Sequence, residues 1–203
     1  MTNKRIIVDA IGCIFNMMKW LNDRTSNMTI KGPHSLEFHQ LVSPTFVDNY
    51  PDTPLQKHFS DVTLAEHILK HDSVYAIEMI DDMKKSLKAI EEMGVEVIIA
   101  MPFSFIGRKL EAMRMLEELP MNIHHYLSSM EKYPDDLIDD NLICVVEDLK
   151  DECDDLEDKG VTALLLDMPW NKGTTKGQRV NNWSQIVKFV EKELSDDKST
   201  KAQ

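Results

Sequence analysis

The sequence predicts an α/β fold in which a parallel sheet is covered by helices on both faces. Two observations predict it. Four short segments have almost entirely apolar centres, as strands that are buried on both faces do; they lie at 4–9, 95–100, 142–146 and 161–167. Segments with helical periodicity separate most of them along the chain, and this alternation is typical of a parallel sheet.

The first strand, KRIIVD at 4–9, has β-branched residues at its centre and charged residues at its edges. The second strand is VEVIIA at 95–100, the third is LICVV at 142–146, and the fourth is VTALLLD at 161–167. Ligands of such sheets bind at the carboxyl ends of the strands. The residues that follow each strand are therefore the candidates for function.

Between the first two strands, apolar residues recur at spacings of three and four from Val74 to Met93, which predicts an amphipathic helix. Ser73 is its expected N-cap, and Gly94 is expected to end it. Further helices are predicted at about 106–118, at 148–160 closing at Gly160, and at 182–194.

Residues 16–72 show no regular periodicity and contain scattered prolines, which indicates an insertion or small cap after the first strand. We therefore predict one domain over residues 1–195 and a polar, frayed tail over 196–203.

The net charge of the chain excludes one class of partner. It has 203 residues and a formal net charge of −12, and such a surface repels a phosphate backbone, so we expect no nucleic acid polymer as a partner. No segment approaches the roughly 18 apolar residues that a membrane span requires. Three cysteines without metal-binding spacing indicate reduced thiols, and hence a cytoplasmic protein.

Two aspartates end predicted strands: Asp9 closes the first and Asp167 closes the last. Carboxylates at the ends of adjacent parallel strands can converge, and their hard oxygens suit Mg²⁺. One of the pair could attack phosphorus while the metal neutralises the transferring group. The alternative is that both merely cap strand or helix ends, as aspartates often do.

The segments around these aspartates favour the first interpretation. IIVDAIGCIFN at 6–16 resembles the first motif of the haloacid dehalogenase-like (HAD-like) superfamily. LLLDMPWNKG at 164–173 and RVNNWSQIVKFV at 179–190 resemble later segments of its 5'(3')-deoxyribonucleotidase-like branch, with degenerate motifs. The resemblance implies a three-layer Rossmann-like fold with a parallel sheet and a small cap after the first strand.

The resemblance also implies a site. Asp9 would be the nucleophile that forms an aspartyl-phosphate, and Lys150 would pair with it. Mg²⁺ would be held by Asp9, the backbone carbonyl of Ile11 and Asp167. The residues expected near a substrate are Gly12, which would also form the tight turn, together with Ser104, Trp170 and Asn171.

The sequence departs from the family pattern where phosphatases place their general acid. Ile11 stands at the position of the second aspartate of the first motif and cannot protonate a leaving alkoxide. The segment 99–102 offers no hydroxyl to a phosphoryl group.

Three interpretations follow. The chain could be a Mg²⁺-dependent phosphohydrolase, 5'-nucleotidase-like, that acts on a small phosphorylated molecule such as a nucleotide. It could instead be a catalytically impaired protein of the same fold that binds a ligand or a protein partner. The segment at 6–16 also resembles that of haloacid dehalogenases, whose halide leaving group needs no proton. A homo-oligomer remains open.

Overall fold

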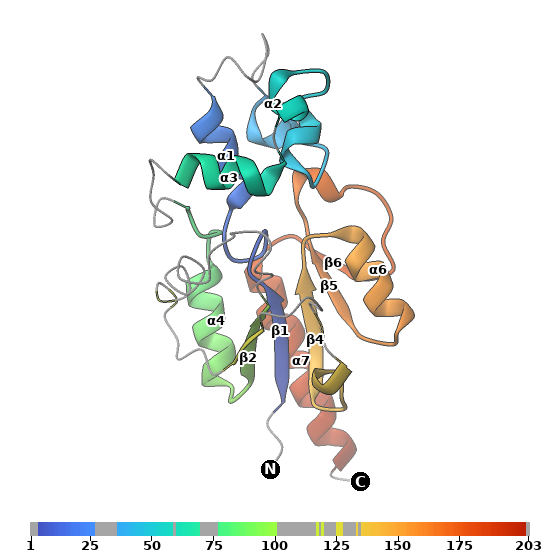
Figure 1. Cartoon of the computed structure of the whole chain (residues 1–203). Coiled ribbons are helices and arrows are strands. Elements are labelled where there is room, and N and C mark those ends of the chain that lie inside the picture. The colour runs from blue at the N-terminus through green and yellow to red at the C-terminus, as the bar shows by residue number, and fades with distance from the viewer. Residues whose placement is uncertain are drawn as a thin grey trace.

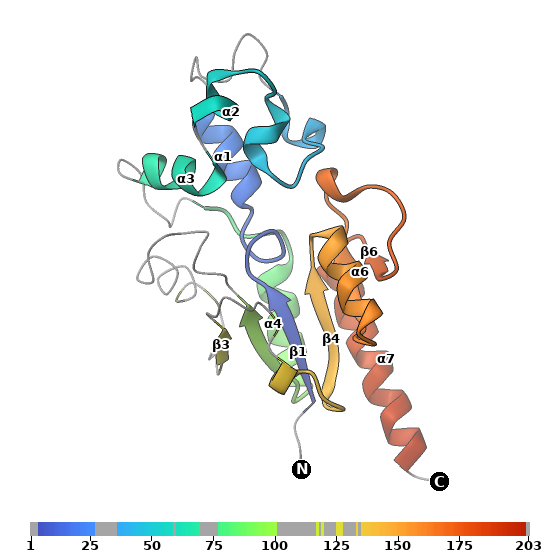
Figure 2. The ribbon, with the colours of Figure 1, turned by 45° about the vertical axis from the view of Figure 1, so that its right-hand side comes forward.

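A computed structural model describes residues 4–26, 36–58, 60–69, 77–100, 117, 119, 125–127, 133 and 135–201. Their centre is a six-stranded, fully parallel sheet in the order β3-β2-β1-β4-β5-β6 (Figures 1 and 2). The strands are β1 (Arg5–Asp9), β2 (Glu96–Ala100), β3 (His125–Leu127), β4 (Leu142–Glu147), β5 (Ala163–Leu166) and β6 (Gln178–Val180).

Strand β1 lies inside the sheet, between β2 and β4. Its last residue, Asp9, is in register with Ala100 of β2, and Val8 is in register with Val146 of β4. The carboxyl ends of these three strands therefore lie side by side, and the residues that follow β1 and β4 are neighbours at the carboxyl-terminal end of the sheet.

Helices cover both faces of the sheet. On one face lie α4 (Met83–Glu92) and α7 (Trp183–Lys201), which also pack against each other; on the other lies α6 (Lys150–Asp158) (Figures 1 and 2). The alternation of side chains along β1 serves both faces, because Ile6 and Val8 belong to one buried apolar cluster and Ile7 belongs to the other. The three-layer α/β architecture predicted from the sequence is confirmed.

The segment between β1 and α4 contains short helices: α1 (Met17–Thr25), η2 (Phe38–Gln40), η3 (Phe46–Asn49), α2 (Pro54–His58) and α3 (Asp61–Leu69). These helices lie beyond the carboxyl ends of the strands, whose arrowheads point toward them in Figures 1 and 2. Buried and partly buried polar contacts hold them together. The Asp61 carboxylate accepts from the backbone N–H groups of Phe46 and Val47 at 2.6 and 2.9 Å, and the Tyr50 hydroxyl donates to Asn22 at 2.8 Å.

The strand predictions agree with the structure to within a few residues, but two helix boundaries were wrong. The helix expected from Ser73 begins at Met83, since residues 77–82 form a non-helical segment in which Met79 bridges to Phe15; residues 73–76 lie outside the described residues. The last helix, α7, continues to Lys201, so most of the tail predicted to fray is helical. Gly94 and Gly160 do follow helices, with φ angles of +79° and +77°.

Within the described parts of the chain, no helix combines the length and the apolar character that crossing a membrane requires.

Candidate functional site

Asp9 is the last residue of β1, and its side chain is 2% exposed. The chain turns sharply after it: the backbone N–H groups of Ile14 and Phe15 both donate to the carbonyl of Ala10, at 3.2 and 2.9 Å. Gly12 lies in this turn with a φ of +93°, a conformation that disfavours any side chain. The tight turn predicted at Gly12 is confirmed, and it directs the chain from the sheet toward α1.

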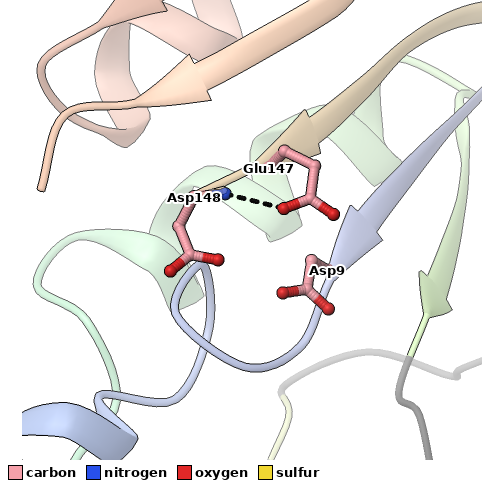
Figure 3. A group of neighbouring side chains, drawn as sticks. All are labelled: Asp9, Glu147 and Asp148. Carbon is pink, nitrogen blue, oxygen red and sulfur yellow. Dashed lines mark hydrogen bonds between the residues drawn. The ribbon is translucent and has the colours of Figure 1, made fainter. Parts of the chain in front are cut away.

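Three carboxylates meet at the carboxyl ends of β1 and β4. One oxygen from each of Asp9, Glu147 and Asp148 lies within 4.8 Å of the other two, and all three side chains are buried (Figure 3). We call these three residues the acidic cluster. Asp9 comes from β1, Glu147 is the last residue of β4, and Asp148 follows it directly.

Glu147 is fully buried, and several donors fix its carboxylate. One oxygen accepts from the backbone N–H groups of Asp148 and Leu149 at 3.0 and 3.2 Å, and the other accepts from the phenol of Tyr133. Burial first, then the negative charges of Glu147 and Asp9, raises the pKa of Tyr133 well above its usual value. The phenol therefore keeps its proton and donates it to the Glu147 hydrogen bond.

Asp148 is held by two residues of the 3₁₀ turn η7 (Pro169–Asn171), which follows β5. The indole Nε1 of Trp170 donates to Asp148 Oδ2 at 3.0 Å, and Asn171 Nδ2 donates to the Asp148 carbonyl at 2.8 Å. The turn at Gly12 lies directly against the same carboxylate: a Cβ atom on Gly12 would be 2.2 Å from the Asp148 Cγ.

The donor set suits a small hard cation. Three buried carboxylates so close together repel one another when ionised, and a divalent cation is the common means of offsetting that repulsion. Carboxylate oxygens are the ligands that Mg²⁺ prefers. The residues present therefore fit Mg²⁺, although the carboxylates beside Asp9 are Glu147 and Asp148 and not Asp167, which was expected from the sequence.

Comparison with known proteins identifies the architecture. No family model and no curated protein sequence matches the chain. Among solved structures, a predicted phosphatase from Clostridium acetobutylicum is similar over 94% of this chain and 100% of its own, with a TM-score of 0.61 and 10% identity. The fold is that of the haloacid dehalogenase-like hydrolases.

Two further structures support this. A haloacid dehalogenase-like family hydrolase from Streptococcus pneumoniae covers 93% of this chain and 99% of its own, at a TM-score of 0.56 and 12% identity. A β-phosphoglucomutase from Clostridium difficile covers 96% of this chain and 100% of its own, at a TM-score of 0.54 and 11% identity. At such low identity the similarity shows a HAD-like fold and not a particular reaction.

The sequence predicts Asp9 and Asp167 at the ends of adjacent strands, where their carboxylates could converge. The structure shows that this prediction was wrong. Strand β4 lies between β1 and β5, which Asp167 follows. The Asp167 carboxylate forms ion pairs with Lys172 at 2.6 Å and with Arg179 at 2.7 Å. Burial raises its pKa, but these two cations outweigh burial and lower the pKa overall. Asp167 therefore has its own positive partners and does not belong to the acidic cluster.

The remaining predicted site residues have mixed outcomes. Lys150 begins α6, and its ammonium pairs with Asp154 at 2.6 Å and Asp151 at 3.7 Å, so both ion pairs shown for it lie within its own helix. The Ile11 side chain packs against the apolar core. Ser104 lies outside the described residues.

Trp170 and Asn171 are near the acidic cluster, but they are 6% and 3% exposed, and their polar groups bond to the protein. The Asn171 side chain donates to the carbonyls of Asp148 and Leu166 and accepts from Met168 N and Arg179. The Asn171 amide is thus engaged in holding the chain, and contact of Trp170 or Asn171 with a substrate stays a prediction.

Sequence reasoning missed Glu147 and Asp148. The signal was present, because two acids follow directly after a predicted strand at 142–146. These two acids do not stand out in the sequence, because the helix predicted at 148–160 is rich in aspartate and glutamate throughout.

Proposed function

We propose that this chain is a HAD-like phosphohydrolase that uses Asp9 as its nucleophile and Mg²⁺ as its cofactor. The observation that supports the proposal best is the acidic cluster, which lies buried at the carboxyl ends of two neighbouring strands of a HAD-like sheet. Asp9 and Asp148, with the backbone carbonyl of Ile11, would hold the metal. When bound, Mg²⁺ neutralises charge on the transferring phosphoryl group.

Asp9 would supply the reactive oxygen. In the first step its carboxylate forms a bond to phosphorus while the bond between phosphorus and the leaving oxygen breaks, which leaves an aspartyl-phosphate. Water then attacks phosphorus, releases inorganic phosphate and restores the carboxylate. The turn at Gly12 places the backbone directly beside Asp148 of the acidic cluster.

Ile11 sets the preferred leaving group. An isoleucine side chain cannot donate a proton to the leaving oxygen, and that contribution is typically worth about 10²–10⁴-fold in rate. Substrates whose leaving group is already a stable anion do not need this proton. We therefore expect an aryl phosphate to be hydrolysed faster than an alkyl phosphate such as a nucleoside monophosphate, and the rate of aryl phosphate hydrolysis to rise as the leaving group becomes more acidic.

The natural substrate class we propose is a small phosphorylated molecule, with a nucleotide as the first candidate. This choice comes from the segments LLLDMPWNKG and RVNNWSQIVKFV, which resemble the deoxyribonucleotidase-like branch. The helices between β1 and α4, interpreted as a cap, lie beyond the strand ends, where they would contact the part of the substrate that differs between enzymes (Figure 1). We also propose a cytoplasmic location, because the three cysteines lack metal-binding spacing and indicate reduced thiols. We propose no nucleic acid polymer as a partner, because of the net charge of −12.

The test is phosphate release from p-nitrophenyl phosphate and from a panel of nucleoside monophosphates, with and without Mg²⁺. Asp9→Asn keeps the shape of the side chain but removes the attacking oxyanion, so we expect it to abolish turnover. Asp139→Asn is the matched control, because Asp139 precedes β4 at the opposite end of the sheet and pairs there with Arg5. Equal phosphate release by the unsubstituted protein and by Asp9→Asn would refute the proposal.

A second candidate is a catalytically impaired HAD-like protein that acts by binding. The observation in its favour is Ile11, whose side chain packs against the core where phosphatases of this fold carry an acid. It predicts that a nucleotide or a protein partner binds equally well to the unsubstituted protein and to Asp9→Asn, without turnover. A dehalogenase is the third candidate, and release of halide from a 2-haloacid would distinguish it.

A further inference from the structure

Two consecutive residues of η7 hold Asp148 in two different ways. Trp170 binds its carboxylate through the indole N–H, and Asn171 binds its backbone carbonyl through the side-chain amide. A carboxylate that follows a strand end can rotate about its Cβ–Cγ bond. An N–H group 3.0 Å from Oδ2 fixes that rotation, and the backbone bond fixes the position from which the side chain starts.

The turn that carries these two donors is itself clamped by the neighbouring strand β6. Arg179 donates to the Asn171 carbonyl at 2.8 Å, to its side-chain oxygen at 2.9 Å and to the Gly173 carbonyl at 2.9 Å. The same guanidinium pairs with Asp167. The bonds from Arg179 therefore fix the position of η7 after β5. Because Trp170 and Asn171 bond to Asp148, the fixed turn also fixes the position of Asp148.

The Trp170 ring also touches the segment between β1 and α4. Phe38 in η2 meets it edge to face, with ring centroids 5.9 Å apart and an interplanar angle of 82°. Edge-to-face contacts of this kind hold two rings in a defined relative orientation. Trp170 is thus fixed by Phe38 on one side and bonded to Asp148 on the other.

We propose that Trp170 is a positioning residue for the metal ligand Asp148. Its indole N–H holds one carboxylate oxygen so that the carboxylate is oriented for a divalent cation before the cation arrives. This inference rests on the metal site of the proposed function, and it assigns to Trp170 a role other than contact with substrate. Groups that orient a metal ligand typically contribute about 10–100-fold to metal affinity.

The experiment compares Mn²⁺ affinity in the full chain, by titration followed with electron paramagnetic resonance, for the unsubstituted protein, Trp170→Phe and Trp20→Phe. Trp170→Phe keeps an aromatic ring against Phe38 but removes the N–H. Trp20→Phe is the matched control, because Trp20 is 3% exposed and its indole nitrogen has no hydrogen-bond partner within the described residues. Both variants lose the same atoms from a buried ring, and only one loses a bond to Asp148.

We expect Trp170→Phe to weaken Mn²⁺ binding by about 10–100-fold and Trp20→Phe to leave it unchanged. A merely structural role for Trp170 would lower the melting temperature of the metal-free protein without changing Mn²⁺ affinity, and that result would overturn the inference. Equal weakening by both variants would overturn it as well, because the effect would then be general.

If Trp170→Phe does not fold, 3-benzothienylalanine placed at position 170 carries the same comparison, since it keeps the shape of the ring and lacks the N–H. The outcome is separable from the fate of the proposed function. Absence of Asp9-dependent phosphate release would refute the phosphohydrolase while leaving the Mn²⁺ comparison valid. Unchanged Mn²⁺ affinity in an active enzyme would refute only the role of Trp170.

Discussion

Replacing Gly12 by alanine should displace the Asp148 carboxylate in the acidic cluster, in addition to straining the turn. Gly12 has a φ of +93°, and a Cβ placed there would lie 2.2 Å from both Cγ and Oδ2 of Asp148 and 2.5 Å from its Oδ1. No alanine can occupy that space while Asp148 stays where it is. The carboxylate must therefore move away from Gly12, and its hydrogen bond to Trp170 breaks or lengthens.

Two contributions set the expected loss of stability. Forcing an L-residue into the left-handed region costs about 1–2 kcal/mol. Losing a hydrogen bond to a buried charged group costs about 1.5–3 kcal/mol. We therefore expect Gly12→Ala to lower the free energy of unfolding by about 2.5–5 kcal/mol, since both costs apply.

The control is Gly94→Ala. Gly94 has a φ of +79°, but a Cβ there would meet nothing within 4 Å, so only the conformational cost of about 1–2 kcal/mol applies. Urea unfolding at neutral pH measures both variants, and Mn²⁺ titration measures the state of the acidic cluster. We expect weaker Mn²⁺ binding in Gly12→Ala alone. Equal loss of stability in the two variants, with Mn²⁺ affinity unchanged in both, would show that Asp148 is not held against Gly12.

Two more predictions concern the groups that surround the cluster. Tyr133→Phe removes a donor from the buried Glu147 carboxylate, so we expect the free energy of unfolding in urea to fall by about 1–3 kcal/mol; an unchanged value would contradict the contact. Asp167→Asn tests the ion pairs with Lys172 and Arg179, which hold the Asp167 pKa below its ordinary value. Their contribution to stability is therefore present above the unfolded-state pKa and is lost as the pH falls through the folded-state pKa. We expect this variant to be less stable than the unsubstituted protein by up to about 1 kcal/mol at pH 7 and the difference to shrink toward pH 2, and a difference that does not change with pH would refute this.

The sheet could be predicted from the sequence because its strands are apolar on both faces. Such segments, IIV in β1 and ALLL in β5 among them, contrast with everything around them. Strands β3 and β6 could not be predicted in the same way. They have three residues each, and β6 is the polar segment QRV at the edge of the sheet, where packing on one side suffices.

Of the acidic cluster, the sequence predicts Asp9 but not the carboxylates that lie beside it. Asp9 follows from its place at the end of a buried strand, but its partner depends on strand order, and the sequence alone does not give that order. Asp167 and Asp148 both follow parallel strands, and only the pairing of β1 with β4 decides between them. The segment LLLDMPWNKG carries part of the family resemblance, but the sequence does not show that its Trp170 and Asn171 bond to Asp148, as the structure does.

The central place of β1 has a consequence for how the chain folds. Glu147 and Asp148 are synthesised about 140 residues after Asp9, so the acidic cluster closes only when β4 docks beside β1. That step brings three carboxylates together against their mutual repulsion. A divalent cation would find few of its ligands assembled before β4 docks. It would therefore act mainly by slowing the escape of β4 from the finished sheet, and would lengthen the lifetime of the native state more than it shortens the time needed to reach it.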